Sequence, residues 1–302
     1  MKTMNNQETS RSRALQGHIS VLVANVIFGL GVPVSKMLLD DWVSPMGYIV
    51  SRSIGAALIF WTLQCFMPRE RVEKKDLAVI ILGGVLGFAV SQTLTAWALY
   101  FTSPVYFAIL ASLTPVAVML LTVFLAMERL TWLKTLGVLG AIAGGLLLIL
   151  PGSEIRKGAN DRLGIFLAVL AVLTWAVYVV ITRKVSAKYS AVTQMKWMFL
   201  VSAIVTLPIM LQEDAAQPLY SSAWAWSGVA EMTFIVLGAT VLGYFMIPWA
   251  LRRISATTVS VYTNLQPVVA MLVAIMIGQD QFSWLLVVSC GLVLLGGWLA
   301  TK

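Results

Sequence analysis

The chain alternates between long apolar stretches and short polar segments, and ten of the apolar stretches are long enough to cross a membrane. A helix needs about 20 apolar residues to span the hydrocarbon core of a bilayer. The predicted spans are residues 18–39, 46–66, 77–100, 103–126, 132–150, 161–183, 191–211, 229–251, 257–277 and 283–301. The pattern therefore predicts an all-α integral membrane protein with ten transmembrane helices.

The apolar pattern also repeats along the chain. When the sequence is shifted by 152 positions, Trp97-Ala98-Leu99 falls on Trp249-Ala250-Leu251, and the first spans of the two halves correspond at an offset of 147, where Phe28 meets Trp175. Each half holds five spans, and because five is odd the second half enters the membrane inverted relative to the first. The predicted organisation is a cytoplasmic tail over 1–17, a first five-helix repeat over 18–150, an outer linker over 151–160 and a second five-helix repeat over 161–302. Inverted repeats are typical of transporters that work by alternating access.

Composition agrees with a membrane protein. The chain is 59% hydrophobic and 11% charged, with a mean hydropathy of +0.88, whereas soluble domains carry about 25% charged residues. The connections between predicted spans are mostly short, which leaves no room for a soluble domain.

The basic residues are distributed unevenly between the two sides of the membrane. Fifteen Lys and Arg lie in the N-terminal tail and after the even-numbered spans, against four after the odd-numbered ones. By the positive-inside rule this predicts a multi-pass protein of the plasma or inner membrane with both termini in the cytoplasm. The net charge of +8 then reflects membrane orientation and makes lipids, rather than nucleic acid, the acidic partners.

Several spans contain residues that weaken helices. Pro115 and Pro267 occupy equivalent places in the fourth and ninth spans, where paired kinks would shape a central cavity. The pairs Gly144-Gly145 and Gly296-Gly297 favour close packing of the fifth and tenth spans against each other. We therefore expect spans 1, 3, 4, 6, 8 and 9 to enclose a cavity and spans 5 and 10 to lie at its periphery.

Motifs along the whole chain, roughly residues 18 to 301, resemble those of the drug/metabolite transporter superfamily, specifically its EamA-type members. The motifs are Ala24-Asn25-Val26-Ile27-Phe28-Gly29-Leu30-Gly31-Val32-Pro33-Val34-Ser35-Lys36, Ser51-Arg52, Leu113-Thr114-Pro115 and Glu128-Arg129-Leu130-Thr131, the last repeated more weakly as Asp280-Gln281-Phe282-Ser283. The resemblance implies a secondary transporter that exports small metabolites such as amino acids, coupled in some members to protons. It does not imply which metabolite.

Two charged residues stand out because they lie inside predicted spans. Arg52 lies about two turns, roughly 12 Å, from the outer end of the second span, and charged groups at such depth usually face a cavity or a partner. Arg52 is expected either to bind a solute carboxylate or to pair with Glu231. Lys196 lies as deep in the seventh span, but its long side chain could also reach the inner headgroups.

Polar and aromatic residues on the enclosing spans are the other candidates for binding a solute. Amides in hydrocarbon require partners, and a mixture of aromatic walls and amide groups suits a small amphipathic solute. The predicted substrate-binding residues are Asn25, Arg52, Gln92, Thr95, Trp175, Tyr178, Tyr244, Tyr262 and Asn264.

Glu231 is the one carboxylate predicted inside a span, near the outer end of the eighth. A carboxylate in apolar surroundings can exchange a proton near neutral pH, which makes Glu231 the candidate for proton coupling. An ordinary interfacial residue near a helix N-terminus is the alternative.

Other functional classes have less support in the sequence. An intramembrane enzyme would need a nucleophile with a base, a metal cluster or paired carboxylates, and the chain has a single His and no such motif. We expect no metal and no cofactor. A flippase for a lipid or lipid carrier remains the alternative on the same fold, and the sequence leaves open whether the chain works alone or as a homodimer.

Overall fold

The computed structural model describes residues 2–125, 131–147, 158–212, 217–222, 224–251, 253–254, 262–263 and 265–300. Every regular element in these ranges is a helix. The helices are α1 (Lys2–Asp41), α2 (Pro45–Cys65), α3 (Lys74–Gly83), η1 (Gly84–Val90), α4 (Ser91–Phe101), α5 (Pro104–Ala111), α6 (Thr114–Phe124), α7 (Trp132–Leu147), α8 (Asp161–Lys188), α9 (Ala191–Met210), α10 (Pro218–Ser221), α11 (Trp226–Thr233), η2 (Phe234–Leu242), α12 (Gly243–Leu251), α14 (Leu265–Met276) and α15 (Trp284–Ala300).

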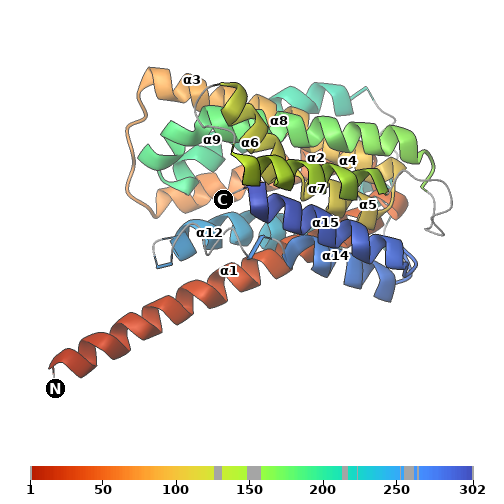
Figure 1. Ribbon diagram of the computed structural model, residues 1–302. Helices are drawn as coiled ribbons and strands as arrows, with labels where there is room; N and C mark the ends of the chain where they lie inside the picture. Colours follow the sequence, from red (N-terminus) through yellow and green to blue (C-terminus); the bar gives the residue numbers. More distant parts are fainter. Residues whose placement is uncertain are drawn as a thin grey trace.

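The all-helical membrane fold predicted from the sequence is confirmed. In the described residues seven helical segments are long and apolar enough to cross a membrane, and three shorter apolar helices, α7, α14 and α15, occupy the remaining predicted spans. Three of the spans are interrupted: α3, η1 and α4 follow one another, as do α5 and α6, and as do α11, η2 and α12. The first predicted span begins later than the helix, because α1 continues back to Lys2 through the predicted tail, and its first turns extend beyond the packed helices (Figure 1).

The two halves interlock rather than lie beside each other. Helix α8, the first of the second half, packs on α4 and α6 of the first half, and helix α1 makes the equivalent contacts with α12 and α14 of the second half. Helices α2 and α9 pack against each other, as do α7 and α15, which lie side by side at one face of the molecule (Figure 1). The first helix of each half therefore completes the packing of the other.

The interruptions lie at equivalent places in the two halves. The π-helical segments η1 and η2 occupy the middle of the third and eighth spans, where glycines let aromatic rings approach the backbone. A Cβ added at Gly87 would lie 2.6 Å from the ring of Tyr178, and one at Gly243 would lie 2.5 Å from the ring of Phe28. These glycines therefore allow close packing of aromatic rings at places where the helix departs locally from the α-helical form.

The fourth span breaks where the sequence predicts a kink. Helix α5 ends at Ala111 and α6 begins at Thr114, directly before Pro115, because the proline ring cannot donate the next backbone hydrogen bond. Its counterpart Pro267 is the third residue of α14, and residues 255–261 before it lie outside the described residues.

Small residues bring α7 and α15 into close contact, as the glycine pairs predict. A Cβ added at Gly296 would collide with the backbone nitrogen of Ala141 and lie 2.5 Å from the carbonyl oxygen of Gly137, and one at Gly144 would lie 2.8 Å from the carbonyl oxygen of Ser289. Neither helix contributes to the lining of the central cavity described below.

We expect Gly296→Ala to destabilise the protein by about 1–3 kcal/mol, because the added methyl group forces two backbones apart. Gly291→Ala in the same helix is the matched control, since a Cβ at Gly291 meets no atom within 4 Å, and it should leave the melting temperature in detergent unchanged or slightly raised. Equal melting temperatures for the two variants would show that the α7–α15 contact does not need its glycines.

Candidate functional site

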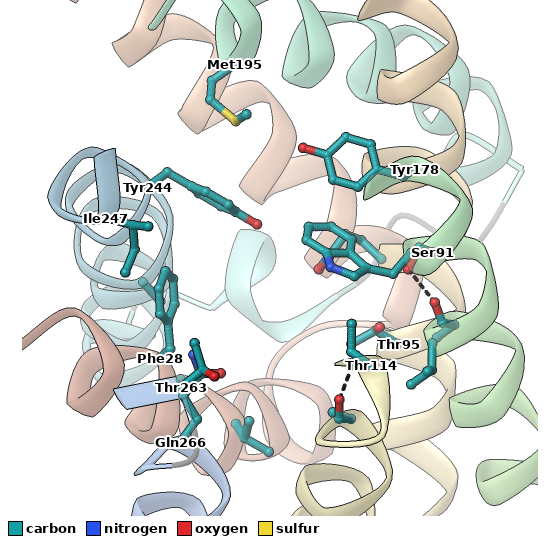
Figure 2. Close-up of a pocket in the computed structure, with 18 of the residues that line it drawn as sticks. Phe28, Ser91, Thr95, Thr114, Tyr178, Met195, Tyr244, Ile247, Thr263 and Gln266 are labelled. Atoms are coloured by element: carbon teal, nitrogen blue, oxygen red, sulfur yellow. Dashed lines mark hydrogen bonds between the residues drawn. The ribbon is translucent and has the colours of Figure 1, made fainter. Parts of the chain in front are cut away.

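A central cavity of about 1010 Å³ lies between the two halves. Its lining comes from the six spans that the sequence predicts as its walls, and also from α2 and the start of α9. Seen in Figure 2, the hydroxyl groups of Tyr178 and Tyr244 point into the cavity from opposite sides, and Phe28, Thr263 and Gln266 lie along one wall. The volume is sufficient for a small metabolite.

Aromatic rings form two related walls. Phe28 and Trp175, which correspond in the two halves, both line the cavity. Each ring contacts a tyrosine: the ring centroids of Phe28 and Tyr244 are 5.9 Å apart, and those of Trp175 and Tyr178 are 4.7 Å apart. These rings give the cavity flat apolar surfaces with polar groups at their edges.

Arg52 is fixed in the cavity by two neutral acceptors. Its Nε donates to the Thr240 hydroxyl at 2.8 Å, and its Nη1 donates to the amide oxygen of Gln92 at 2.9 Å. Thr240 belongs to η2 of the second half, whereas Gln92 belongs to α4 of the first. Arg52 therefore does not pair with Glu231 in this structure, which was one of the two alternatives predicted for it.

The position of Arg52 follows from the N-terminus of α2. Ser44 caps α2 and accepts the N–H of Gly47, in the same way that Ser190 caps α9 and accepts the N–H of Thr193. The two caps are 146 positions apart, so the α9 counterpart of Arg52 is Met198, which is fully buried in an apolar cluster. At this pair of equivalent positions, only the first half therefore carries a charge.

Asn25 does not face the cavity directly, although sequence analysis places it among the lining residues. Its side chain is fully buried; its Nδ2 donates to the carbonyl oxygen of Val21 at 2.7 Å. Its Oδ1 accepts from Nε2 of Gln266 at 2.6 Å, and Gln266 does line the cavity. Asn25 therefore orients a lining amide from behind.

The remaining predicted site residues differ in whether they line the cavity. Thr95, like Gln92, lines the cavity. Tyr262 lies away from the lining, with its hydroxyl 3.1 Å from Nδ1 of His18. Asn264 lies outside the described residues.

Glu231 also lies away from the cavity lining, on the short helix α11. Its Oε2 is buried without a hydrogen-bond partner among the described residues, and Asp41 at the end of α1 interacts with it electrostatically. The carboxylate that sequence analysis assigns to proton coupling is therefore separate from Arg52.

One end of the cavity reaches the ends of the helices. Glu70, Lys188 and Ser190 are among the residues that line it there. The Glu70 carboxylate accepts from the backbone N–H and the hydroxyl of Ser190, each at 3.0 Å. Burial opposes ionisation of Glu70, yet these hydrogen bonds and one from Thr193 hold its pKa below the ordinary value. Lys188 is paired with Glu73 at the same end.

At the opposite end, hydrogen bonds join residues of α1, α2 and α10 and of the segments beside these helices. The hydroxyls of Ser35 and Tyr48 lie 2.8 Å apart. The side chain of Gln217 hydrogen-bonds the capping Ser44 through its amide nitrogen at 3.0 Å, and the Tyr220 hydroxyl contacts Ser51. The lining thus reaches the helix ends near Glu70, whereas the helices at the opposite end are joined by these hydrogen bonds.

Sequence reasoning missed some residues of the site. Thr240 is a single hydroxyl in an apolar run, and its contact with Arg52 joins residues 188 positions apart, which no local pattern reveals. Phe28 had a signal, because the repeat aligns it with Trp175, a predicted site residue. Glu70 lies in a connection between spans, outside the predicted enclosing helices.

We expect Asn25→Leu to lower the free energy of unfolding by about 1–3 kcal/mol, because it leaves the Gln266 amide without its buried acceptor. Tyr262→Phe is the control: it removes a predicted site hydroxyl that does not line the cavity, and its cost should stay within about 1 kcal/mol. Melting temperatures in detergent compare the two, and a stable Asn25→Leu protein would contradict the orienting role.

Proteins of similar sequence are transporters by name. The chain is 26% identical over 216 residues to the uncharacterized transporter YyaM of Bacillus subtilis, an alignment that covers 70% of this chain and 69% of that protein. It is 27% identical over 286 residues to a probable terminal-alkyne amino-acid exporter of Streptantibioticus cattleyicolor, which covers 92% and 88% of the two chains.

The fold and the repeat are also found in known proteins. A protein of known crystal structure superposes with a TM-score of 0.64 at 19% identity, covering 96% of this chain and 98% of the other, which shows a shared fold. The model of the EamA-like transporter family matches twice, over residues 15–150 and 162–302. The resemblance seen in the sequence is therefore confirmed, and the chain belongs to the EamA-like transporter family.

Proposed function

We propose that this protein exports small metabolites such as amino acids across the plasma or inner membrane by alternating access. The observation that carries the proposal is the central cavity, which lies at the junction of two inverted halves and combines aromatic walls with a fixed guanidinium. Family membership and a relative named as an amino-acid exporter support export of a small solute. The comparisons offer no support for a lipid flippase.

The accessible end of the cavity is proposed to face the cytoplasm. It lies at the helix ends that carry Glu70, Lys188 and Ser190, next to connections rich in Lys and Arg, which the positive-inside rule places in the cytoplasm. The opposite end, near Ser44 and Gln217, is proposed to be closed and to face outward. This conformation is the one in which an exporter would load its solute.

Counterflow in proteoliposomes tests the proposed function. Vesicles that contain the purified protein and are loaded with one amino acid should accumulate the labelled form of the same amino acid, while protein-free vesicles should not. The panel would include amino acids, nucleobases and cationic drugs. No accumulation of any member by folded protein would argue against a small-metabolite transporter.

Glu231 is proposed to exchange the coupling proton. Its Oε2 is buried and accepts no hydrogen bond from the described residues, and a second carboxylate, that of Asp41, interacts with it electrostatically. A carboxylate in apolar surroundings can take up and release a proton near neutral pH. Because Glu231 lies away from the cavity lining, proton binding would be coupled to solute binding through a movement of α11 and α1.

Glu231→Gln is expected to abolish transport driven by a pH gradient while leaving counterflow exchange intact, because Gln cannot release a proton. Glu73→Gln is the matched control, since Glu73 is an exposed carboxylate paired with Lys188, and it should retain the response to the gradient. Transport rates with and without an imposed pH gradient distinguish the variants. An unchanged pH response in Glu231→Gln would leave facilitated diffusion as the mechanism.

A further inference from the structure

We propose that the solutes of this cavity carry a carboxylate, which the guanidinium of Arg52 binds, and that the apolar or aromatic body of the solute lies against the rings of Phe28, Trp175 and Tyr178. The inference rests on the proposed transport function and names the class of solute for the same cavity. Three observations carry it: the charges of the lining, the way in which Arg52 is held, and the absence of a symmetric counterpart.

Among the charged lining residues, Arg52 is the one that lies deep in the cavity, away from its accessible end. Three described lining residues are charged, namely Arg52, Glu70 and Lys188. Lys188 is ion-paired at 2.8 Å with both Glu73 and Asp76. Glu70 lies at the same accessible end and is hydrogen-bonded to Ser190. Among the described lining residues, Arg52 thus supplies the single positive charge of the inner cavity.

Arg52 is held in place without being neutralised. Its two hydrogen bonds, from Nε and Nη1, go to the neutral oxygens of Thr240 and Gln92, and the described residues place no carboxylate against it. A cation in low-dielectric surroundings attracts an anion strongly when no counter-charge is present. The planar fork of N–H donors that remains on the guanidinium fits the two oxygens of a carboxylate.

The second half carries no charge at the positions equivalent to Arg52 and Gln92. The α9 counterpart of Arg52 is the buried Met198, and the repeat partner of Gln92 is Tyr244, whose ring also lines the cavity. Deep in the cavity a solute ammonium would therefore meet ring faces, which stabilise a cation only modestly, because Glu70, the carboxylate among the described lining residues, lies at the accessible end. The carboxylate, rather than the amine, is expected to decide whether a solute binds.

Four probes with the same phenyl body separate these contributions. Phenylalanine and 3-phenylpropionate carry a carboxylate, whereas phenylalaninamide and 2-phenylethylamine do not. We expect the two carboxylates to bind the purified full-length protein in calorimetric titrations and to compete in counterflow, and the other two to do neither at the same concentration. Equal binding of all four would overturn the solute class and leave the transport function standing; a failure of counterflow with every member of the larger panel would instead count against the function.

Arg52→Met should weaken binding of 3-phenylpropionate by about 10- to 100-fold, because charge-assisted hydrogen bonds are lost. Arg52→Lys keeps the charge but not the fork, and it should still lose several-fold. Lys196→Met is the matched control: Lys196 is also a cation within a span, but it is bound to Gln64 and lies outside the cavity lining, so binding should be unchanged.

Gln92→Glu tests the same site with Arg52 in place. The new carboxylate would lie against the guanidinium and occupy it, so binding of 3-phenylpropionate should fall as it does in Arg52→Met. Melting temperatures measured beside each titration show which variants are folded. If Arg52→Met does not fold, binding of 3-phenylpropionate by Gln92→Glu tests the proposal on its own. Folded variants of either kind that bind 3-phenylpropionate as the wild type does would overturn the proposal.

Discussion

The packing of each half's first helix on the other half is the constraint on which the rest of the structure depends. Helix α1 packs on α12 and α14, and α8 packs on α4 and α6, so neither five-helix repeat is complete alone. Between helices in lipid the hydrophobic effect supplies little attraction, and close contact through small residues takes its place. At Gly87 and Gly243 this contact also seats Tyr178 and Phe28, so the packing that joins the halves builds the cavity walls.

The two halves repeat the same order of spans around the cavity, but several paired positions carry different side chains. The repeat pairs Gln92 with Tyr244 and Thr95 with Ile247, and all four residues line the cavity. A symmetric backbone allows each half to take the conformation of the other, which alternating access requires. Because the paired positions carry different side chains, a solute in the cavity would meet a more polar side and a more apolar side, which would favour one orientation of binding.

Much of this could be predicted from the sequence, for physical reasons that differ between fold and site. Membrane spans follow from the cost of exposing backbone and charge to lipid, which leaves a long apolar run as a local signal. Arg52 stands out for the same reason. The partners of a polar side chain are often distant in the sequence. Asn25 was predicted to line the cavity because its amide needs a hydrogen-bond partner, but that partner is Gln266, 241 positions away. Thr240 gave no signal, since a single hydroxyl in an apolar helix can bond to its own backbone, as it also does to the Ile235 carbonyl.

Arg52 lines the inner cavity, and its hydrogen bonds also connect the two halves. Gln92 belongs to the third span of the first half, and Thr240 to its counterpart, the third span of the second half. A movement that separates these spans would break one of the two hydrogen bonds of the guanidinium and leave a partly buried charge less well stabilised. A carboxylate bound to the guanidinium would offset that loss. Since a ligand shifts a conformational equilibrium only through its different affinity for the two states, a solute that binds Arg52 has a physical means of favouring the change from one open end to the other.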